Sequence, residues 1–315
     1  MRFYLICILL LLASACAKST TTASETRESP APVAAAQNVD QELERRLKII
    51  SDGAQGTISL SVVHIESGKT IAINGDSQLP LYSVYKLPLA IAVLKDVEEN
   101  RLRLDQKIHV IPAEVVQGAP ANSAIWKKPI DFTIEQLLEF SISRSDNTSS
   151  DKLVQLVGGP LKVTERMRSL GFQNLDIHIS SGEFVKTRQN PNTGSADDLA
   201  KLVVQLHEGK ILQPPQMNLL IGFMQRATTG LQRLRGDLPR GTLVADKTGS
   251  GEPDAITKVA KVTNDVGLIT LPSGRGHLAI AVLVNGSKLP DAAQEKLIAE
   301  LARAAYDAFS GDQAK

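Results

Sequence analysis

The spacing of apolar residues predicts a helix followed by a hairpin near the start of the folded chain. Over residues 39–50 apolar side chains recur every three or four positions among charged ones, which predicts an amphipathic helix. Residues 57–65 and 69–74 have the apolar, β-branched composition of strands, and Glu66-Ser67-Gly68 between them predicts a turn. The fold is therefore expected to open with a helix and two paired strands.

A second pair of strands and a closing helix are predicted near the carboxyl end. Residues 266–270 and 278–284 are apolar runs of strand length, separated by the turn sequence Pro272-Ser273-Gly274. Residues 291–309 place apolar side chains on one helical face. Because the intervening chain is mostly helical in pattern, we expect an α+β fold, with an antiparallel sheet built from both chain ends, flanking helices and an all-helical lobe. Residues 38–315 are predicted to form one folded module.

The residues before this module differ from the rest of the chain. Residues 1–16 combine a positive start, an apolar run and the small residues Ala13-Ser14-Ala15, which predicts a cleaved export signal too short to span a bilayer. Cys16 follows directly and resembles a lipid-acceptor cysteine, although Ala13 stands where that motif prefers Leu. Lipidation at Cys16 and simple secretion both stay open, and either predicts a periplasmic or cell-envelope location. Residues 17–37, rich in Ser, Thr, Ala and Pro, predict a flexible linker.

The composition is that of a globular protein, and its charge does not favour binding to a polyanion such as nucleic acid. Hydrophobic residues make up 43% of the chain and the formal net charge is only +1, so nothing predicts nucleic-acid binding. Both cysteines, Cys7 and Cys16, precede the folded module, which therefore holds no disulfide and no thiolate metal site. The five histidines are scattered along the sequence without metal-binding spacing, and we expect neither a metal nor another cofactor.

The first of three motifs with candidate chemistry is Ser83-Val84-Tyr85-Lys86, which precedes a fully apolar run. The pattern predicts a buried helix whose first turn places a hydroxyl beside an amine. An amine enclosed by apolar side chains loses proton affinity, so Lys86 can act as a base that activates Ser83 as a nucleophile. Taken alone, the pattern equally fits a helix-capping serine and a lysine whose amine reaches solvent.

The second motif is Ser145-Asp146-Asn147. It follows a helix that Thr133 and Gln136 are predicted to cap reciprocally at its start. Three short polar side chains at this point can face a site. In isolation the motif is also explained as a turn in which Asn147 or Thr148 caps the next helix.

The third motif, Lys247-Thr248-Gly249-Ser250-Gly251, continues a strand predicted from residues 242–245. We expect this strand at the edge of the sheet, where its ammonium and hydroxyl groups lie on one side. The glycines are expected to let a ligand approach the backbone closely.

The three motifs occur in the order in which the class A serine β-lactamases and the related penicillin-binding proteins carry them, and the chain resembles this family. The resemblance covers roughly residues 40–310 and includes the stretch Thr263–Gly267. It implies an enzyme that opens a β-lactam through a serine acyl-enzyme. In this scheme Ser83 is the nucleophile, Lys86 is its proton acceptor and Ser145 passes a proton to the leaving nitrogen.

The same resemblance implies how the substrate is held. Asn147 binds the acylamino side chain of the β-lactam, and Lys247 and Thr248 hold its carboxylate. The backbone N–H groups of Ser83 and Ser250 form the oxyanion hole, where one donor is worth about 10²- to 10³-fold in rate.

An arginine near the third motif supports carboxylate binding in many family members, sometimes fourteen residues before the motif lysine. Arg233 stands at that offset from Lys247. Arg235 is the nearby competitor, and either arginine is also explained as a solvated surface charge.

Hydrolysis of the acyl ester needs a group that activates water, which class A members supply from a loop glutamate, usually followed four positions later by an asparagine. Within residues 177–196 the sequence has a single carboxylate, Glu183, and the resemblance implies that it is this base. Thr187 stands where the asparagine is usual, although Asn190 or Asn192 could supply the amide. Glu183 also fits a solvated loop residue.

Three functions remain in comparison at this point. The first is β-lactam hydrolysis, which confers antibiotic resistance. The second is a penicillin-binding D-alanyl-D-alanine carboxypeptidase with slow deacylation, and the third is a non-catalytic envelope lipoprotein. The short loop around Glu183 favours the peptidase, whereas the compact length without an accessory domain favours the lactamase. Every motif serine and lysine is present, which disfavours the third. We therefore predict a monomeric serine β-lactamase acting on a small-molecule substrate.

Overall fold

The computed structural model describes residues 32–117, 125–251 and 261–311, with side chains from residue 41 onward. Residues 39–315 form one compact unit. The predicted export signal, including Cys16, and most of the predicted linker lie outside the described residues. The first helix, α1 (Pro32–Asp52), begins seven residues before the helix expected at 39–50, so the last part of the predicted linker is helical. Within the described ranges, no helix combines the length and apolar character needed to cross a membrane.

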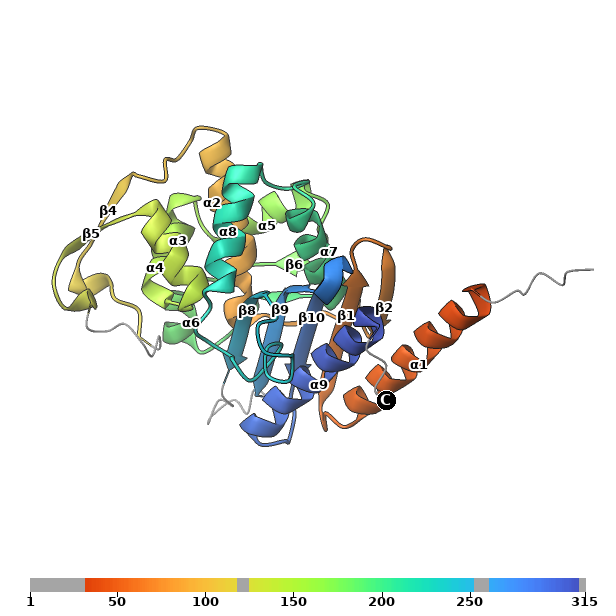
Figure 1. Cartoon of the computed structure of the whole chain (residues 1–315). Coiled ribbons are helices and arrows are strands. Elements are labelled where there is room, and N and C mark those ends of the chain that lie inside the picture. Colours follow the sequence, from red (N-terminus) through yellow and green to blue (C-terminus); the bar gives the residue numbers. More distant parts are fainter. Residues whose placement is uncertain (1–31, 118–124, 252–260, 312–315) are drawn as a thin grey trace, which may run out of the picture. The chain divides into compact units, whose positions relative to one another are not determined.

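Strands from both chain ends form a five-stranded antiparallel sheet, as the sequence predicted (Figure 1). Its order is β2 (Lys69–Ile73), β1 (Thr57–His64), β10 (His277–Asn285), β9 (Val262–Thr270) and β8 (Val244–Gly251). The β1–β2 hairpin and β10 match their predicted positions, whereas β9 starts four residues earlier than expected. The third motif lies on β8, at the edge of the sheet.

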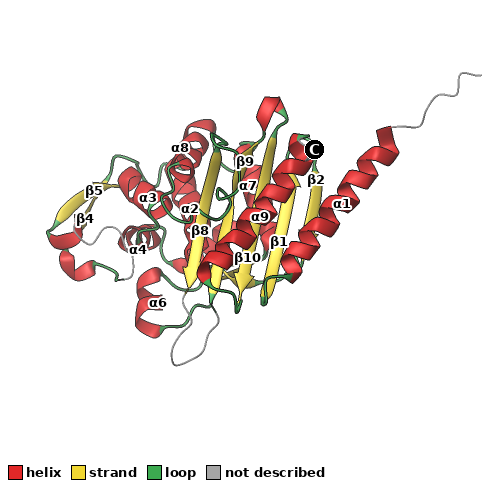
Figure 2. Ribbon diagram, turned by 60° about the horizontal axis from the view of Figure 1, so that its bottom comes forward, coloured by secondary structure: helices red, strands yellow, loops and turns green. Residues whose placement is uncertain are grey.

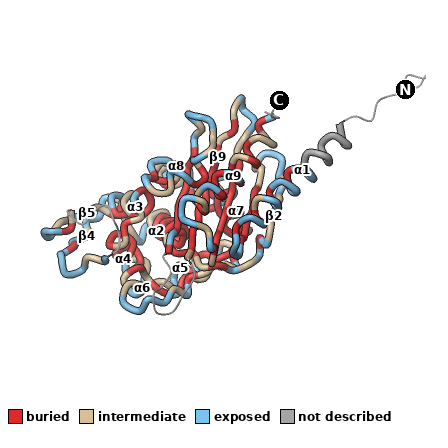
Figure 3. The backbone as a smooth tube through the Cα atoms, turned by 90° about the horizontal axis from the view of Figure 1, so that it is seen from below, coloured by how far each residue is buried: buried red, intermediate tan, exposed pale blue. Residues whose placement is uncertain are grey.

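Side chains of the central strand β10 alternate between two apolar cores. Ile280, Val282 and Val284 pack with α9 (Asp291–Ser310) and with Leu43 and Leu47 of α1. Their neighbours in the strand pack on the opposite face, against the helical part of the molecule. This alternation follows from the pleat of a strand, which points successive side chains to opposite faces. Figure 2 shows α9 crossing one face of the sheet, and Figure 3 shows that the buried segments gather in the middle of the molecule.

The helical lobe is formed by the middle of the chain. Its helices are α2 (Lys86–Glu98), α3 (Ile134–Ser143), α4 (Asn147–Leu156), α5 (Pro160–Ser169), α6 (Ser181–Thr187), α7 (Ala196–His207) and α8 (Pro214–Gln225). Two small sheets accompany them, one of β3 (Leu79–Pro80), β7 (Thr193–Gly194) and β6 (Leu175–Asp176), the other of β4 (Lys107–Val110) and β5 (Ile130–Thr133). Helix α2 is apolar on every side and wholly buried along residues 86–94, as its sequence predicted.

Candidate active site

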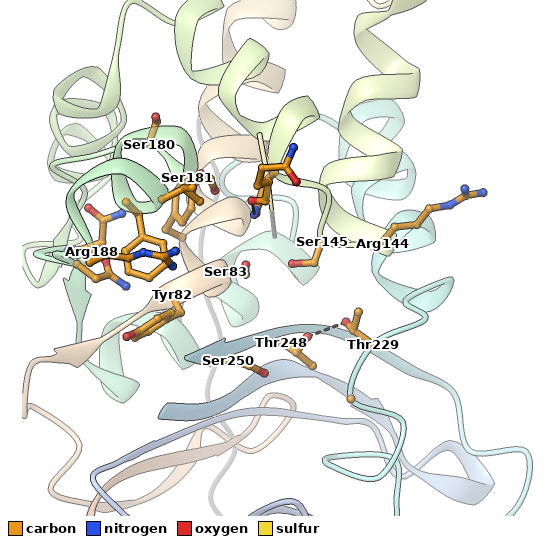
Figure 4. A pocket seen from close by; sticks show the side chains of 18 of the residues that line it. Tyr82, Ser83, Arg144, Ser145, Ser180, Ser181, Arg188, Thr229, Thr248 and Ser250 are labelled. Carbon is orange, nitrogen blue, oxygen red and sulfur yellow. Dashed lines mark hydrogen bonds between the residues drawn. The ribbon is translucent and has the colours of Figure 1, made fainter. Parts of the chain in front are cut away.

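The three motifs converge on one cavity of about 560 Å³ between the helical lobe and the edge strand β8. Six of the residues predicted for the site line it: Ser83, Ser145, Asn147, Arg233, Thr248 and Ser250. Figure 4 shows Ser83 and Ser145 facing the space above β8, with Thr248 and Ser250 on the strand below them. Segments separated by more than a hundred residues therefore supply a single site.

Ser83 lies on a short 3₁₀ turn, η1 (Tyr82–Tyr85), that leads directly into α2. The prediction that Ser83 lies in the first turn of the α-helix itself was wrong, because the regular helix begins only at Lys86. The preceding residue, Tyr82, has a left-handed backbone with φ +47°. Such a conformation is unfavourable for a bulky residue and is kept only where packing enforces it. Here the buried Tyr82 ring packs edge-on against Phe184.

The glycines of the third motif let β8 lie against this turn. A Cβ on Gly249 would come within 2.5 Å of the Leu81 carbonyl oxygen, and a Cβ on Gly251 would overlap the Tyr82 ring at 2.1 Å. The sequence predicted that these glycines admit a ligand. The structure shows that they instead make room for the Leu81 backbone and the Tyr82 ring, which precede Ser83. Because these glycines lack side chains, β8 can pack against the turn and hold the candidate nucleophile in place.

Lys86 is completely buried beneath the cavity. Its Nζ donates hydrogen bonds to the Ser145 carbonyl oxygen at 2.5 Å and to Asn147 Oδ1 at 2.8 Å, and it lies 3.4 Å from Ser145 Oγ. Burial lowers the pKa of Lys86 to about 7, against the opposing attraction of Asp146 and Asp151. The amine is therefore neutral in a large fraction of molecules near pH 7, which is the form that can accept a proton.

Ser145 lies between two buried amines. Lys247 Nζ donates a hydrogen bond to Ser145 Oγ at 3.0 Å and another to the carbonyl oxygen of Thr248 at 2.7 Å. Burial, and then the nearby charge of Lys86, lower the pKa of Lys247 well below its usual value. Neither lysine lines the cavity itself, whereas the Ser145 hydroxyl does. This hydroxyl is thus placed to pass a proton between the cavity and the amines.

The Ser145 turn is held by the residue that follows it. Asp146 is buried and caps α4, accepting a hydrogen bond from the backbone N–H of Ser149 at 2.7 Å. Asp146 Oδ2 also accepts one from the Trp126 indole at 3.2 Å. The alternative explanation of the motif, in which Asn147 or Thr148 caps this helix, is therefore wrong. With Asp146 in that role, the Asn147 side chain is left to line the cavity and to accept from Lys86.

The structure distinguishes the two candidate arginines. Arg233 lines the cavity and donates to Ser250 Oγ at 2.7 Å and to the Gly249 carbonyl oxygen at 3.1 Å. Arg235 instead forms an ion pair with the fully buried Asp246, its Nε lying 2.8 Å from Oδ1. Arg233 is thus the arginine placed beside the third motif, and Arg235 neutralises a carboxylate within the fold.

Several lining residues have no local sequence signal, and most arrive on loops or on α6. They include Tyr82, Gln117, Arg144, Ser180, Ser181 and Arg188. Among the described residues, the lining contains three arginines and no aspartate or glutamate, and one of the three, Arg233, also pairs with Glu295 at 3.2 Å. A cavity with this charge favours an anionic ligand, such as a substrate carboxylate.

Glu183 is not part of the cavity. Within α6, Ser181, Phe184 and Val185 line it, at the helical spacing of positions i, i+3 and i+4, and Arg188 lines it from the residue that follows the helix. Glu183 is two residues after Ser181 and therefore projects from the opposite side of the helix, where it is exposed. The sequence identified the right segment but could not decide which face of α6 turns inward. The prediction that Glu183 activates water therefore has no support from the geometry.

We expect Glu183→Gln to leave the rate of β-lactam turnover within about twofold of the wild-type rate, since an exposed side chain outside the cavity cannot orient a water on the ester. Steady-state hydrolysis of a chromogenic cephalosporin measures this. Lys186→Gln, on the same outward side of α6, is the matched control. Accumulation of a covalent adduct in Glu183→Gln alone would restore Glu183 as the base.

Two polar side chains, Asp151 and the buried Asn192, anchor the segment from which α6 turns one face to the cavity. Asp151 on α4 accepts from the Ser180 hydroxyl at 3.0 Å and from the Gly182 backbone N–H at 2.9 Å. Asn192 is buried and accepts from the backbone N–H groups of His178 and Ile179. Asn192 thus uses its amide to fix the loop backbone, and it also lines the cavity, as does Asn190. That one of these two asparagines supplies an amide for water activation stays a prediction. No sequence motif marks Asp151.

The cavity holds a serine, Ser83, on a turn that begins with the strained residue Tyr82. A second hydroxyl, that of Ser145, contacts two buried amines, and arginines line the cavity. These groups can support acyl transfer to a substrate that carries a carboxylate. With the α+β architecture, this arrangement defines a serine hydrolase of the acyl-enzyme type. Comparison with known proteins then identifies the family: residues 42–309 match the model of the β-lactamase enzyme family, and the chain belongs to it.

Individual relatives agree with this identification. The chain is 33% identical to the extended-spectrum β-lactamase PER-1 of Pseudomonas aeruginosa, over 84% of this chain and 86% of that protein. A β-lactamase structure from Chitinophaga pinensis superposes with a TM-score of 0.80 at 34% identity, covering 86% of this chain and 99% of that one. A class A β-lactamase structure from Bacteroides cellulosilyticus gives 0.80 at 26% identity, covering 87% and 99%. The protein is a class A serine β-lactamase that hydrolyses β-lactams, as the sequence predicted.

Proposed function

We propose that Ser83 is the nucleophile of this β-lactamase. Its Oγ attacks the lactam carbonyl carbon, the ring C–N bond breaks, and the substrate remains attached to Ser83 as an ester. The observation that carries this assignment is the placement of Ser83 in the same cavity as Ser145 and Thr248, on a backbone turn held against β8. In this mechanism Ser145 hands a proton to the departing nitrogen, since its hydroxyl contacts both buried amines.

The substrate carboxylate is held at the β8 side of the cavity. Thr248, whose Oγ1 lies 2.7 Å from Thr229 Oγ1, and Ser250, which accepts from Arg233, offer hydroxyl groups there. Lys247 contributes its charge from beneath them. Asn147 contacts the acylamino side chain, and the backbone N–H groups of Ser83 and Ser250 stabilise the negative oxygen of the intermediate.

Lys86 acts as the base in both halves of the reaction. In acylation, its neutral amine takes the Ser83 proton directly or through Ser145. In deacylation, it takes a proton from the water that attacks the ester. Support comes from its pKa of about 7 and from the lack of any carboxylate among the described lining residues. One base with a pKa near the working pH can serve both steps.

A time course of intact-protein mass spectrometry after mixing with benzylpenicillin tests this function. We expect an adduct with the mass of the whole penicillin that forms and then disappears as free, ring-opened product accumulates, because a serine ester that water can reach is hydrolysed. An adduct that persists for hours would instead indicate a penicillin-binding protein.

We propose that the protein acts in the periplasm or cell envelope as a monomer, either secreted or anchored by a lipid on Cys16; the experiment below tests the anchored form. Support comes from the sequence of residues 1–16, in which the small residues before Cys16 fit the cleavage site of such a signal. We expect Cys16→Ser to move the protein from the membrane fraction to the soluble periplasmic fraction with unchanged specific activity. Fractionation measures this, with Cys7→Ser as the control. If the wild-type protein is itself found in the soluble periplasmic fraction, it is simply secreted.

A further inference from the structure

A second cluster of titratable side chains lies outside the cavity. Glu66 belongs to the turn between β1 and β2, His207 is the last residue of α7 and His277 is the first residue of β10. One donor atom from each lies within 4.8 Å of the other two. Residues that are scattered in the sequence are thus gathered by the packing of α7 against the sheet.

Strand register separates this cluster from the catalytic cavity. His277 pairs with Thr270 at the end of β9, whereas Ser250 of the cavity pairs with Thr263 near the start of the same strand. Seven residues of strand, from 263 to 270, correspond to roughly 23 Å. None of the three cluster residues lines the cavity. The cluster is therefore a separate feature of the molecule.

The Glu66 carboxylate is held in a backbone recess. Its Oε2 accepts the His277 backbone N–H at 2.7 Å, and its Oε1 lies 2.8 Å from His277 Nδ1. A Cβ on Gly276 would come within 2.0 Å of Glu66 Oε2, and Gly276 has φ +97°. Only glycine leaves this space and adopts this conformation without strain, so the chain is shaped around the carboxylate.

Two imidazole rings lie together beside that carboxylate. The rings of His207 and His277 have centroids 4.2 Å apart. His64 is close but engaged, because its Nδ1 contacts Ser67 Oγ at 2.7 Å and its Nε2 contacts the Arg275 carbonyl oxygen at 2.8 Å.

We propose that Glu66, His207 and His277 bind a divalent transition-metal ion of the zinc type, with water completing the coordination. Two imidazole nitrogens and one carboxylate oxygen form a donor set that suits Zn²⁺. Ligands around Zn²⁺ at about 2.1 Å lie roughly 3.4 Å from each other. The donor atoms that lie farthest apart, at up to 4.8 Å, need to approach by about 1.4 Å, and the exposed turn that carries Glu66 allows this.

Such an ion would have a structural effect. It would join the β1–β2 turn, the start of β10 and the end of α7, three segments that otherwise meet through side-chain contacts. A ligand that binds only the folded state stabilises it by mass action. At a hundredfold excess over the dissociation constant, Zn²⁺ is expected to raise the Tm by roughly 5 °C.

The test is calorimetric titration of Zn²⁺ into chelator-treated protein purified without a histidine tag. We expect one saturable site per chain, and visible absorption bands of bound Co²⁺ when that ion replaces Zn²⁺. His207→Gln and His277→Gln should each weaken binding at least tenfold and abolish the Tm increase. Glu66→Gln, which keeps a hydrogen-bond acceptor in the recess, should weaken it as well.

A second histidine–carboxylate pair provides a matched control. His109 Nδ1 lies 2.7 Å from Asp131 Oδ1 on β4 and β5, where the pair is exposed. His109→Gln should leave Zn²⁺ binding unchanged. Each variant should hydrolyse a chromogenic cephalosporin at the wild-type rate, which shows that it is folded. The wild-type rate should be equal with and without chelator, because the cluster lies outside the cavity. The absence of saturable binding, or equal binding in His207→Gln, would overturn the proposal.

Discussion

Ser83→Ala is expected to lower the rate of β-lactam hydrolysis by a factor on the order of 10⁶ and to abolish covalent labelling by a fluorescent penicillin. The reason is chemical. The other groups of the cavity can bind and polarise the lactam, but no ester can form without the Ser83 hydroxyl. In serine hydrolases the loss of the nucleophile alone is about as damaging as the loss of the whole catalytic set. Gel fluorescence and intact-protein mass spectrometry give direct readouts.

The matched control is Ser180→Ala, since Ser180 also lines the cavity but has its hydroxyl bonded to Asp151. This variant should still form the penicillin adduct. If Ser83→Ala kept its label while another serine variant lost it, the assignment of the nucleophile would be refuted.

Lys86→Met is expected to slow both acylation and deacylation, each by about 10²- to 10⁴-fold, the range contributed by a positioned general base. Methionine fills a similar volume in the buried site, which limits the loss of packing. Stopped-flow measurements of adduct formation and decay separate the two rates. If only acylation slowed, another group would have to activate the deacylating water.

The pH profile of the wild type is part of the same prediction. A base must be neutral to accept a proton, and the pKa of Lys86 is about 7. The rate of acylation should therefore rise with pH up to about 7 and level off above it, falling about tenfold per pH unit well below this value. In Lys86→Met this rise of the acylation rate with pH should be absent. If the rate still rose with pH in Lys86→Met, the titrating group would have to be a residue other than Lys86.

The fold was largely predictable because its elements depend on local patterns. The β1–β2 hairpin, β10 and α9 all lie within a residue or so of their predicted bounds, since alternation and helical spacing are properties of short segments. The capping box of Thr133 and Gln136 is present as predicted for the same reason. The boundary at Ser83 was less predictable, because contacts with β8, distant in sequence, shape that turn.

The sequence by itself determined the family and the order of the three motifs, because each motif holds its residues within one turn or one strand. Only the tertiary structure decided what those residues face. It turned Glu183 away from the cavity, selected Arg233 over Arg235 and brought His207 to His277. The physical reason is that burial depends on packing between distant segments: α6 has the same local pattern whichever face meets α4, and scattered histidines become neighbours only when α7 packs against the sheet.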